Sequence, residues 1–366
     1  MAPNAPYRLC FVNSMRTWGG AEVWMLETAQ ALVQRGHAVE FVVNPDSEMR
    51  ERASSAGLPV TPLSIRCDGA FWTIAALAWH LRRRGVTSLI ANCTKDVTIA
   101  APAGRLAGLK SILATRESDF PLRDRFDYRW NFNTLCTGIL VNSMATKNTI
   151  VSSVPWLDES KIHLLYKGID TDFYHPLDAP TGPPVVGFVG QMIRRKGLAA
   201  IMEAWSLIDR QAHTPRPVLR LAGVGEMTPE IEAWRGQLAH PDAVELHGYV
   251  EDMAAFYQGL LVLLMPSHAE GFGLAAAEAM ACAIPVIAGD ASSLPELISH
   301  GETGLLVKPG DSEALLKALE KTLADHSLAR RMGAAGREAV CTKFPQEKSL
   351  TRLLKLTGHS TATHSK

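Results

Sequence analysis

Long hydrophobic segments are absent from the 366-residue sequence. The most apolar candidate for burial in a bilayer, residues 70–81, is about half as long as the roughly 20 residues that a membrane-spanning helix needs. No basic region, apolar run and cleavage site precede the first apolar strand at 9–12. The sequence therefore indicates a cytoplasmic protein without a transmembrane helix.

An excess of charge is also absent, because 37 basic residues balance 37 acidic residues. A balanced chain has no global field to attract nucleic acid, so nucleic-acid binding is not expected. The six cysteines include no CxxC pair and no zinc-like spacing, and the histidines have no metal-ligand partners at useful spacing. These absences predict reduced thiols, no metal site and no bound cofactor.

Apolar residues are plentiful enough for two domains, since they make up 47% of a chain that is long for one core. In the first half, short apolar strands alternate with helical patterns, which is typical of a mostly parallel sheet. The predicted strands are residues 9–13, 38–43, 88–92, 111–115 and 138–142, and the first predicted helix is 21–34.

A proline-rich stretch at 176–184 separates this half from a second alternating series. We therefore predict an α/β protein with two Rossmann-like, doubly wound domains, over 1–178 and 184–345. The stretches 312–323 and 329–356 are predicted to be helical. The C-terminal helix within 346–366 should pack back on the first domain and end in a frayed tail.

The segment Met265–Met280 follows a predicted buried strand and opens a helix. Gly271 and Gly273 allow the backbone to turn sharply and to approach a ligand. The amides that follow lie at a helix N-terminus, where partial positive charge favours a pyrophosphate. Glu270 and Glu278 flank this loop at different depths, and carboxylates accept hydrogen bonds from sugar hydroxyls.

An ordinary glycine turn before an alanine-rich helix would have the same spacing, and the neighbouring sequence decides between the two interpretations. The segment resembles the E-x7-E motif of the retaining family-4 glycosyltransferases of GT-B fold, and the resemblance runs along nearly the whole chain. Its other landmarks are Trp18-Gly-Gly-Ala-Glu22, Lys167-Gly-Ile-Asp170, Gly190-Gln-Met-Ile-Arg-Arg-Lys-Gly197, Ala222-Gly-Val-Gly225, Leu246-His-Gly-Tyr-Val250 and Gly301-Glu-Thr-Gly-Leu-Leu-Val307.

The resemblance implies front-face, retaining transfer of a sugar from a UDP- or GDP-sugar to a carbohydrate or lipid-linked acceptor, without metal. The nucleotide-sugar is a substrate, bound by the second domain, and the first domain presents the acceptor across a cleft that closes about the linker. Assembly of surface polysaccharide, lipopolysaccharide or glycolipid is the family's most frequent role.

By position, the resemblance implies that Glu270 contacts the hydroxyls of the transferred sugar and Glu278 the nucleotide ribose. Lys196 would neutralise the leaving diphosphate, since fixed positive charge stabilises a developing anion. The family commonly has Gly-Arg where this chain has Gly190-Gln191, and Arg195 or its neighbour Arg194 is expected to supply the guanidinium. The amides implied to hold sugar and diphosphate are those of Gly271, Phe272, Gly273 and Leu274.

Further glycine landmarks add candidates. Gly19 and Gly20 stand between a strand and a helix and are expected to close over the diphosphate and acceptor. Gly223 and Val250 are expected to line the nucleotide site. The GxG at 223–225 lacks the third glycine of a dinucleotide fingerprint and is poor evidence for NAD.

Two departures concern the first domain and its end. The family often has a histidine after the strand at 111–115, near the reacting carbon, whereas this chain offers Arg116, Glu117 and Asp119, and Arg116 is the candidate. The sequence Asp170-Thr-Asp172 spells the metal-binding D-x-D of another glycosyltransferase fold. It lies where the family carries an Asn-Gly-Val-Asp type turn, and we predict a structural role.

The stretch 71–84 combines aromatic and basic residues of the kind that dock at the inner face of a membrane, although core packing with a solvated basic end would have the same pattern. A second basic and aromatic stretch, 123–130, lies near the expected acceptor site, and two interpretations stay open for it: contact with a phosphorylated or lipid-linked acceptor, or an ordinary surface helix.

Rival functions remain open at this point. They are a GT-B phosphorylase, a sugar-nucleotide epimerase, a catalytically silent nucleotide-sugar-binding protein, and an NAD enzyme.

Overall fold

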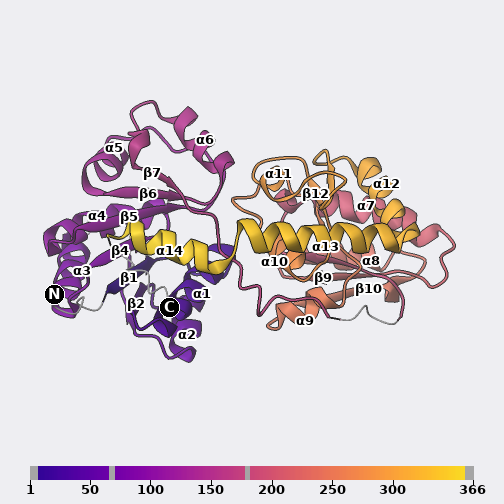
Figure 1. The fold of residues 1–366 in the computed structure, drawn as a ribbon, viewed down its shortest axis with the longest axis horizontal. Coiled ribbons are helices and arrows are strands. Elements are labelled where there is room, and N and C mark those ends of the chain that lie inside the picture. The colour runs from indigo at the N-terminus through magenta and orange to yellow at the C-terminus, as the bar shows by residue number, and fades with distance from the viewer. Residues whose placement is uncertain (1–6, 66–70, 178–181, 359–366) are drawn as a thin grey trace. The chain divides into compact units, whose positions relative to one another are not determined.

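The computed structural model describes residues 7–65, 71–177 and 182–358 (Figure 1). It divides into two compact units, one formed by the chain up to Lys167 together with the part from Glu347 onward, and the other by Gly168–Gln346. The first unit thus ends before position 178. Of the predicted linker, 178–181 lie outside the described residues, as does the predicted frayed tail from 359 onward.

The first unit is built on a parallel sheet of seven strands in the order β3-β2-β1-β4-β5-β6-β7. The order reverses between β1 and β4, which is the switch point at which such sheets bind ligands. Two short strands, β3 and β7, were not predicted. The strands are β1 Arg8–Asn13, β2 Ala38–Val43, β3 Val60–Pro62, β4 Ser88–Ala91, β5 Ser111–Arg116, β6 Gly138–Val141 and β7 Ile162–Leu164.

Helices cover both faces of this sheet, because alternate strand residues point to opposite sides. Cys10 and Val12 lie in a core with α3, α4 and α6, while Leu9 and Phe11 lie in a second core with α1, α2 and α14. The helices are α1 Gly20–Gln34, α2 Glu48–Ser55, α3 Phe71–Arg84, α4 Thr94–Ala107, α5 Phe126–Trp130, the π-helical η1 Asn131–Leu135, α6 Met144–Ser153, the 3-10 turn η2 Glu159–Lys161 and α14 Gln346–Leu356.

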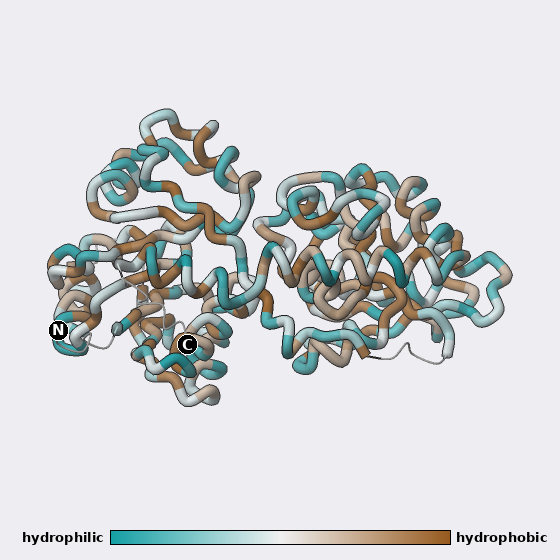
Figure 2. The backbone as a smooth tube through the Cα atoms, viewed as in Figure 1, coloured by the Kyte–Doolittle hydropathy of each residue, from teal (hydrophilic) through white to brown (hydrophobic). Residues whose placement is uncertain are grey.

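The second unit repeats the architecture with six parallel strands in the order β10-β9-β8-β11-β12-β13. Its strands are largely buried, and Figure 2 shows brown hydrophobic segments inside each unit. The strands are β8 Val185–Val189, β9 Val218–Ala222, β10 Val244–Gly248, β11 Val262–Met265, β12 Val286–Gly289 and β13 Gly304–Val307.

Helix α7 of this unit packs on one face of the sheet, in a core that also holds residues of α8 and α12, while α10 packs against α13. The helices are the 3-10 turn η3 Arg194–Lys196, α7 Leu198–Arg210, α8 Thr228–Arg235, η4 Pro241–Ala243, α9 Met253–Gln258, α10 Leu274–Ala281, α11 Leu294–Leu297, α12 Ser312–Ala324 and α13 His326–Lys343.

The helical stretch predicted over 329–356 consists of two helices, because Pro345 has no amide hydrogen and cannot continue α13. The chain at the break pairs with Ile169, whose N–H donates to the Phe344 carbonyl at 2.8 Å and whose carbonyl accepts from Gln346 at 3.0 Å. Leu350 and Leu353 of α14 then pack into the core of the first unit.

Two glycines of α13 give a matched test of helix packing. A Cβ at Gly333 would lie 1.9 Å from the Ala283 carbonyl oxygen, whereas a Cβ at Gly336 would meet its nearest atom, the Thr303 oxygen, at 3.4 Å. Gly333→Ala should lower the free energy of unfolding by about 1–3 kcal/mol through overpacking. Gly336→Ala should be neutral or stabilise by up to about 1 kcal/mol. Equal effects in denaturant titrations would contradict this packing.

Candidate active site

The loops at the carboxyl edge of the second sheet pack backbone to backbone. A Cβ at Gly197 would lie 2.2 Å from the Pro266 oxygen, and one at Gly223 would lie 1.9 Å from the Gly190 oxygen. Gly197 and Gly223 also have φ values of +77° and +130°, which side chains disfavour. Gly223, a predicted nucleotide-site residue, therefore holds the loops after β8 and β9 together.

Glu270 and Lys196 meet at this edge. The Lys196 Nζ lies 2.6 Å from Glu270 Oε1, and the Ser267 hydroxyl donates to the same oxygen at 2.7 Å. Their side chains are only 15% and 9% exposed for lysine and glutamate. The structure thus brings together two residues that are 74 positions apart, and each buried group has an oppositely charged partner.

The backbone of the glycine loop is fixed from two sides. The Arg195 guanidinium donates to the Ala269 carbonyl at 2.6 Å, and the hydroxyls of Ser292 and Ser293 donate to the Glu270 carbonyl at 2.5 and 3.1 Å. Arg194 instead pairs with Glu230 and is largely exposed. Of the two arginines, Arg195 is therefore the one that contacts the glycine loop, and it does so by donating to a backbone carbonyl of the loop.

Gly273 is the N-cap of helix α10; it has φ +90°, and its carbonyl accepts from the Ala276 and Ala277 amides. The Phe272 ring is buried and packs edge-on against the Phe344 ring, with 5.5 Å between the ring centroids. Phe272 therefore contributes its backbone, and not its ring, to the loop. Leu274 is the first helical residue. Amide groups at this helix start lie in the positive end of the helix dipole.

Glu278 lies one turn into α10 and is 5% exposed. The Tyr257 hydroxyl donates to Glu278 Oε2 at 2.7 Å. Burial, and then the Glu278 charge, raise the pKa of Tyr257 well above its usual range. The phenol therefore stays protonated and orients the carboxylate. Val250, also predicted for this site, follows β10 and is half-buried.

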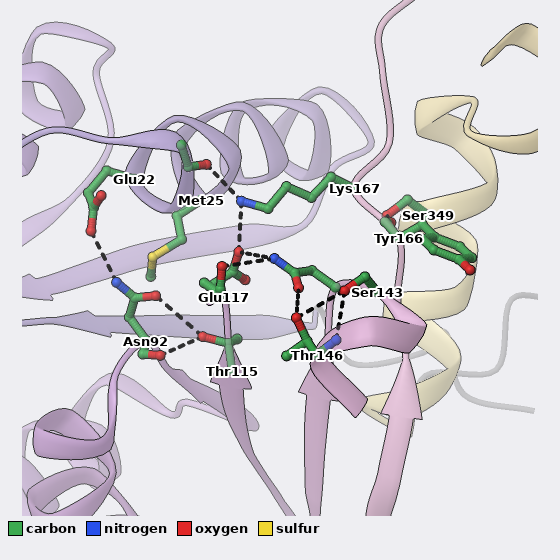
Figure 3. Close-up of polar contacts among 12 residues, drawn as sticks. Glu22, Met25, Asn92, Thr115, Glu117, Ser143, Thr146, Tyr166, Lys167 and Ser349 are labelled. Carbon is green, nitrogen blue, oxygen red and sulfur yellow. Dashed lines mark hydrogen bonds and ion pairs between the residues drawn. The ribbon is translucent and has the colours of Figure 1, made fainter. Parts of the chain in front are cut away.

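In the first unit, polar side chains gather at the carboxyl ends of β1, β4 and β5 (Figure 3). The buried Glu22 carboxylate accepts from the Asn13 and Asn92 amides at 3.0 and 3.1 Å. Asp96, also buried, accepts the Ser14 amide hydrogen at 3.1 Å. Burial raises the pKa of both carboxyls, Glu22 and Asp96.

Lys167 and Glu117 form an ion pair at the same edge of the first sheet, with 2.7 Å between Nζ and Oε2. The Lys167 ammonium also donates to the carbonyl of Gly20 at 2.8 Å. Gly19, extended at φ −159°, is the N-cap of α1 and has no side-chain cap. One of the two glycines predicted at this turn, Gly20, is thus contacted by a lysine from the end of the unit.

Arg116 is not gathered with these residues. It is the last residue of β5, and its guanidinium donates to Thr94 Oγ1 at 3.1 Å and to the Phe120 carbonyl at 2.8 Å. Burial lowers the pKa of Arg116. Its Nε is buried without a hydrogen bond among the described residues.

The D-x-D sequence closes a turn: Asp170 Oδ1 accepts from the amides of Asp172 and Phe173 at 3.1 Å each. Within residues 7–65, 71–177 and 182–358, no three His, Cys, Asp or Glu side chains could hold a metal ion. The five described cysteines are free, and Cys67 lies outside the described part. No described helix is long and apolar enough to cross a membrane.

Several site residues were missed from the sequence. Asn13, Asn92 and Asn142 each end or directly follow a buried strand. A polar residue at the carboxyl end of a parallel strand is a signal that could have found them. Lys167 and Glu117 stand in stretches that the resemblance had marked, but they were not chosen as site residues. Tyr257 carried no local signal.

Known proteins of similar sequence and structure support one family. The profile described as Glycosyltransferase Family 4 matches residues 18–173, and that described as Glycosyl transferases group 1 matches residues 171–339. The lipopolysaccharide core biosynthesis glycosyltransferase LpsE of Rhizobium meliloti is 30% identical over 355 residues, covering 92% of this chain and 95% of LpsE. The chain belongs to the group 1, family-4 glycosyltransferases.

One further relative in sequence and one solved structure are similar to this chain over different lengths. The capsular polysaccharide biosynthesis glycosyltransferase CapM of Staphylococcus aureus is 27% identical, and the chain spans 52% of its length. The Anabaena HepE structure in complex with UDP superposes with a TM-score of 0.83 at 17% identity, covering 96% of this chain and 99% of HepE. The fold is therefore GT-B.

The raised pKa of Glu22 predicts how the thermal stability of this chain depends on pH. The Glu22 pKa is raised above 4.5 by burial, so the folded state holds the proton more tightly than the unfolded state. Stability is lost as pH rises from the unfolded pKa through the folded one. Glu22→Gln, which still accepts from both asparagines, should therefore melt at a higher temperature than wild type near pH 7, with the difference vanishing near pH 4.

The exposed Glu51→Gln serves as the surface control for carboxyl-to-amide exchange. A Glu22→Gln difference that is the same at both pH values would show that the Glu22 proton does not contribute.

Proposed function

We propose that this chain is a retaining, metal-independent glycosyltransferase that moves a sugar from a UDP- or GDP-sugar to a hydroxyl of a carbohydrate or lipid-linked acceptor. The observation that carries the proposal is the contact of Lys196 with Glu270 beside a glycine loop that opens a helix. HepE was crystallised with UDP and with UDP-glucose, which supports a uridine nucleotide as the donor. LpsE and CapM are named for lipopolysaccharide core and capsular polysaccharide biosynthesis, which supports surface-glycan assembly.

The two charges have separate tasks in this proposal. The Lys196 ammonium stabilises the diphosphate as the bond between the sugar and the phosphate oxygen breaks. The Glu270 carboxylate accepts hydrogen bonds from hydroxyls of the transferred sugar. Before the donor binds, each charge neutralises the other, and the site is therefore preorganised without an unpaired buried ion.

Glu278 receives the ribose in this proposal. Its carboxylate is deep, buried and oriented by Tyr257, which suits a bidentate interaction with a diol. The amides of the Gly271–Leu274 turn hold the diphosphate and sugar. The acceptor hydroxyl attacks on the face from which the diphosphate leaves, and its proton passes to the departing phosphate oxygen.

We place the protein at the cytoplasmic face of an anionic membrane, with α3 as the contact. Phe71, Trp72 and Trp79 are 82%, 88% and 62% exposed. The Arg83 guanidinium lies 5.0 Å over the Trp79 ring, α3 contains no acidic residue, and of its three arginines Arg84 is paired with a carboxylate, that of Glu40. Indole rings are enriched at bilayer interfaces, and each nearby arginine adds about 1 kcal/mol of attraction to anionic lipid.

The second predicted stretch, at α5, is less suited to lipid. Its arginines are paired with acidic neighbours, Arg125 with Asp127 at 2.9 Å and Arg129 with Asp124 at 3.2 Å. These pairs cancel the positive charge that an anionic surface would attract.

A donor panel tests the function. UDP-, GDP- and ADP-sugars are added to the full chain without metal and then with magnesium, and both melting temperature and nucleotide release are measured. One nucleotide class should raise the melting temperature without metal and be slowly hydrolysed. Glu278→Ala should lose most of the shift, since a hydrogen bond to a charged group contributes roughly 1.5–3 kcal/mol.

The exposed Glu313→Ala on α12 is the matched control and should behave as wild type. Turnover that needs phosphate favours a phosphorylase, and isomerisation of the free donor favours an epimerase. Tight binding without any turnover favours a silent binding protein, and a shift with NAD alone refutes the donor site.

Vesicle co-sedimentation tests the membrane contact. The wild type should sediment with phosphatidylglycerol vesicles and not with phosphatidylcholine vesicles. Replacing Trp72 and Trp79 together with alanine should weaken binding by at least tenfold, because roughly 1.5–3 kcal/mol is gained for each large apolar side chain buried. Replacing Phe126 and Trp130 of α5 is the control. Loss of vesicle binding only in the α5 control would contradict the assignment of α3 to lipid. So would a wild-type protein that is a dimer and an α3 variant that is a monomer.

A further inference from the structure

Lys167 is a buried cation at a position where the fold does not require one. Its side chain is 5% exposed, and lysine is almost never fully buried unless it is paired. Burial of an ammonium group is costly, so the contacts that retain it indicate what it does. They come from two elements that are far apart in sequence, the end of β5 and the start of α1.

Glu117 is the partner on the β5 side, and it is fixed in turn. The Asn142 amide donates to the Glu117 carbonyl at 3.1 Å and to its Oε2 at 3.3 Å, while Asn142 Oδ1 accepts from Thr146 at 3.1 Å. Figure 3 shows this chain of contacts running from the end of β6 to Lys167. The carboxylate therefore holds the ammonium in one place.

The start of α1 is the element that Lys167 reaches on its other side. The Lys167 Nζ donates to the Gly20 carbonyl at 2.8 Å and lies 5.6 Å from the Trp24 ring centroid. No side chain caps this helix at Gly19, where a serine, threonine, asparagine or aspartate would ordinarily stabilise the first turn. A turn of two adjacent glycines has high conformational freedom, and a contact from outside the helix must restrict it.

Lys167 and Glu117 depend on each other, with 2.7 Å between the ammonium nitrogen and the carboxylate oxygen. Neither charge could be introduced alone without leaving an unpaired buried ion.

We propose that Lys167 is a positioning residue, held by Glu117, that fixes the Gly19–Gly20 turn through the Gly20 carbonyl. This inference rests on the proposed function and on the expectation from the sequence that the turn closes over the diphosphate and acceptor. The pair has two effects that can be separated. Charge neutralisation stabilises the unit, whereas the hydrogen bond to Gly20 orders the turn.

Three variants separate the two effects: Lys167→Met, Glu117→Gln, and the two together. Each single change leaves a buried charge without its partner and should lower the melting temperature. The double variant has no unpaired charge and should recover most of the melting temperature. It still lacks a donor to Gly20, so the turn should remain loose.

Hydrogen exchange of the peptide that covers residues 17–25 reads the turn directly. In wild type the Val23 amide donates to the Gly19 carbonyl at 3.0 Å and should be protected. In the double variant exchange there should be faster by roughly tenfold, the effect of losing a contact worth about 1.4 kcal/mol. Exchange in α10 should not change, because that helix lies in the other unit.

Activity gives a second readout on the donor that the panel identifies. The double variant should bind the nucleoside diphosphate with wild-type affinity and show a kcat for transfer lowered by roughly tenfold or more. Wild-type exchange in 17–25 in the double variant overturns the proposal, whatever the activity. Faster exchange together with a wild-type enzyme that turns over no donor supports the positioning role and refutes only the proposed function.

Discussion

The contact between Lys196 and Glu270 is the interaction on which the proposed function of this protein depends. Two opposite charges that would each be costly to bury lie 2.6 Å apart at the edge of a parallel sheet. They meet because glycines let the loops after β8, β9 and β11 approach to backbone contact, as at Gly197 against Pro266. A side chain at that glycine would separate the loops and the two charges with them.

The two units use one architecture for different purposes. In each, all strands are parallel, so polar groups at their carboxyl ends meet at one edge. In the second unit the edge offers a cation, two buried carboxylates and a helix start, which suits an anionic ligand that also carries hydroxyls. In the first unit it offers buried asparagines around Glu22 and a lysine that is already bound to Glu117. The first edge is thus built to hold its own turn in place.

The sequence was sufficient for those features whose signal is local. The alternation of apolar strands predicted the two parallel sheets, and the glycine spacing between Glu270 and Glu278 predicted a turn that opens a helix. The contact between Lys167 and Glu117 could not be predicted, because the residues are joined only by the order of strands in the sheet. The same holds for Tyr257 and Glu278, which come from different helices.

Two other details depend on more than the sequence pattern. The helical stretch predicted over 329–356 divides in two because Pro345 interrupts a helical pattern that continues on both sides. Arg195 and Arg194 are neighbours in a short 3-10 turn, and only the direction of each side chain distinguishes them. Such directions depend on packing and cannot be obtained from spacing alone.

The most direct measurement is the affinity of the preferred nucleoside diphosphate and of its parent nucleoside for wild type and for Lys196→Met. If the lysine stabilises the diphosphate, the variant should bind the diphosphate about 10- to 100-fold more weakly, since a charged hydrogen bond contributes roughly 1.5–3 kcal/mol, and should bind the nucleoside unchanged. Equal affinity of both proteins for the diphosphate, or an equal loss for both ligands, would contradict the account.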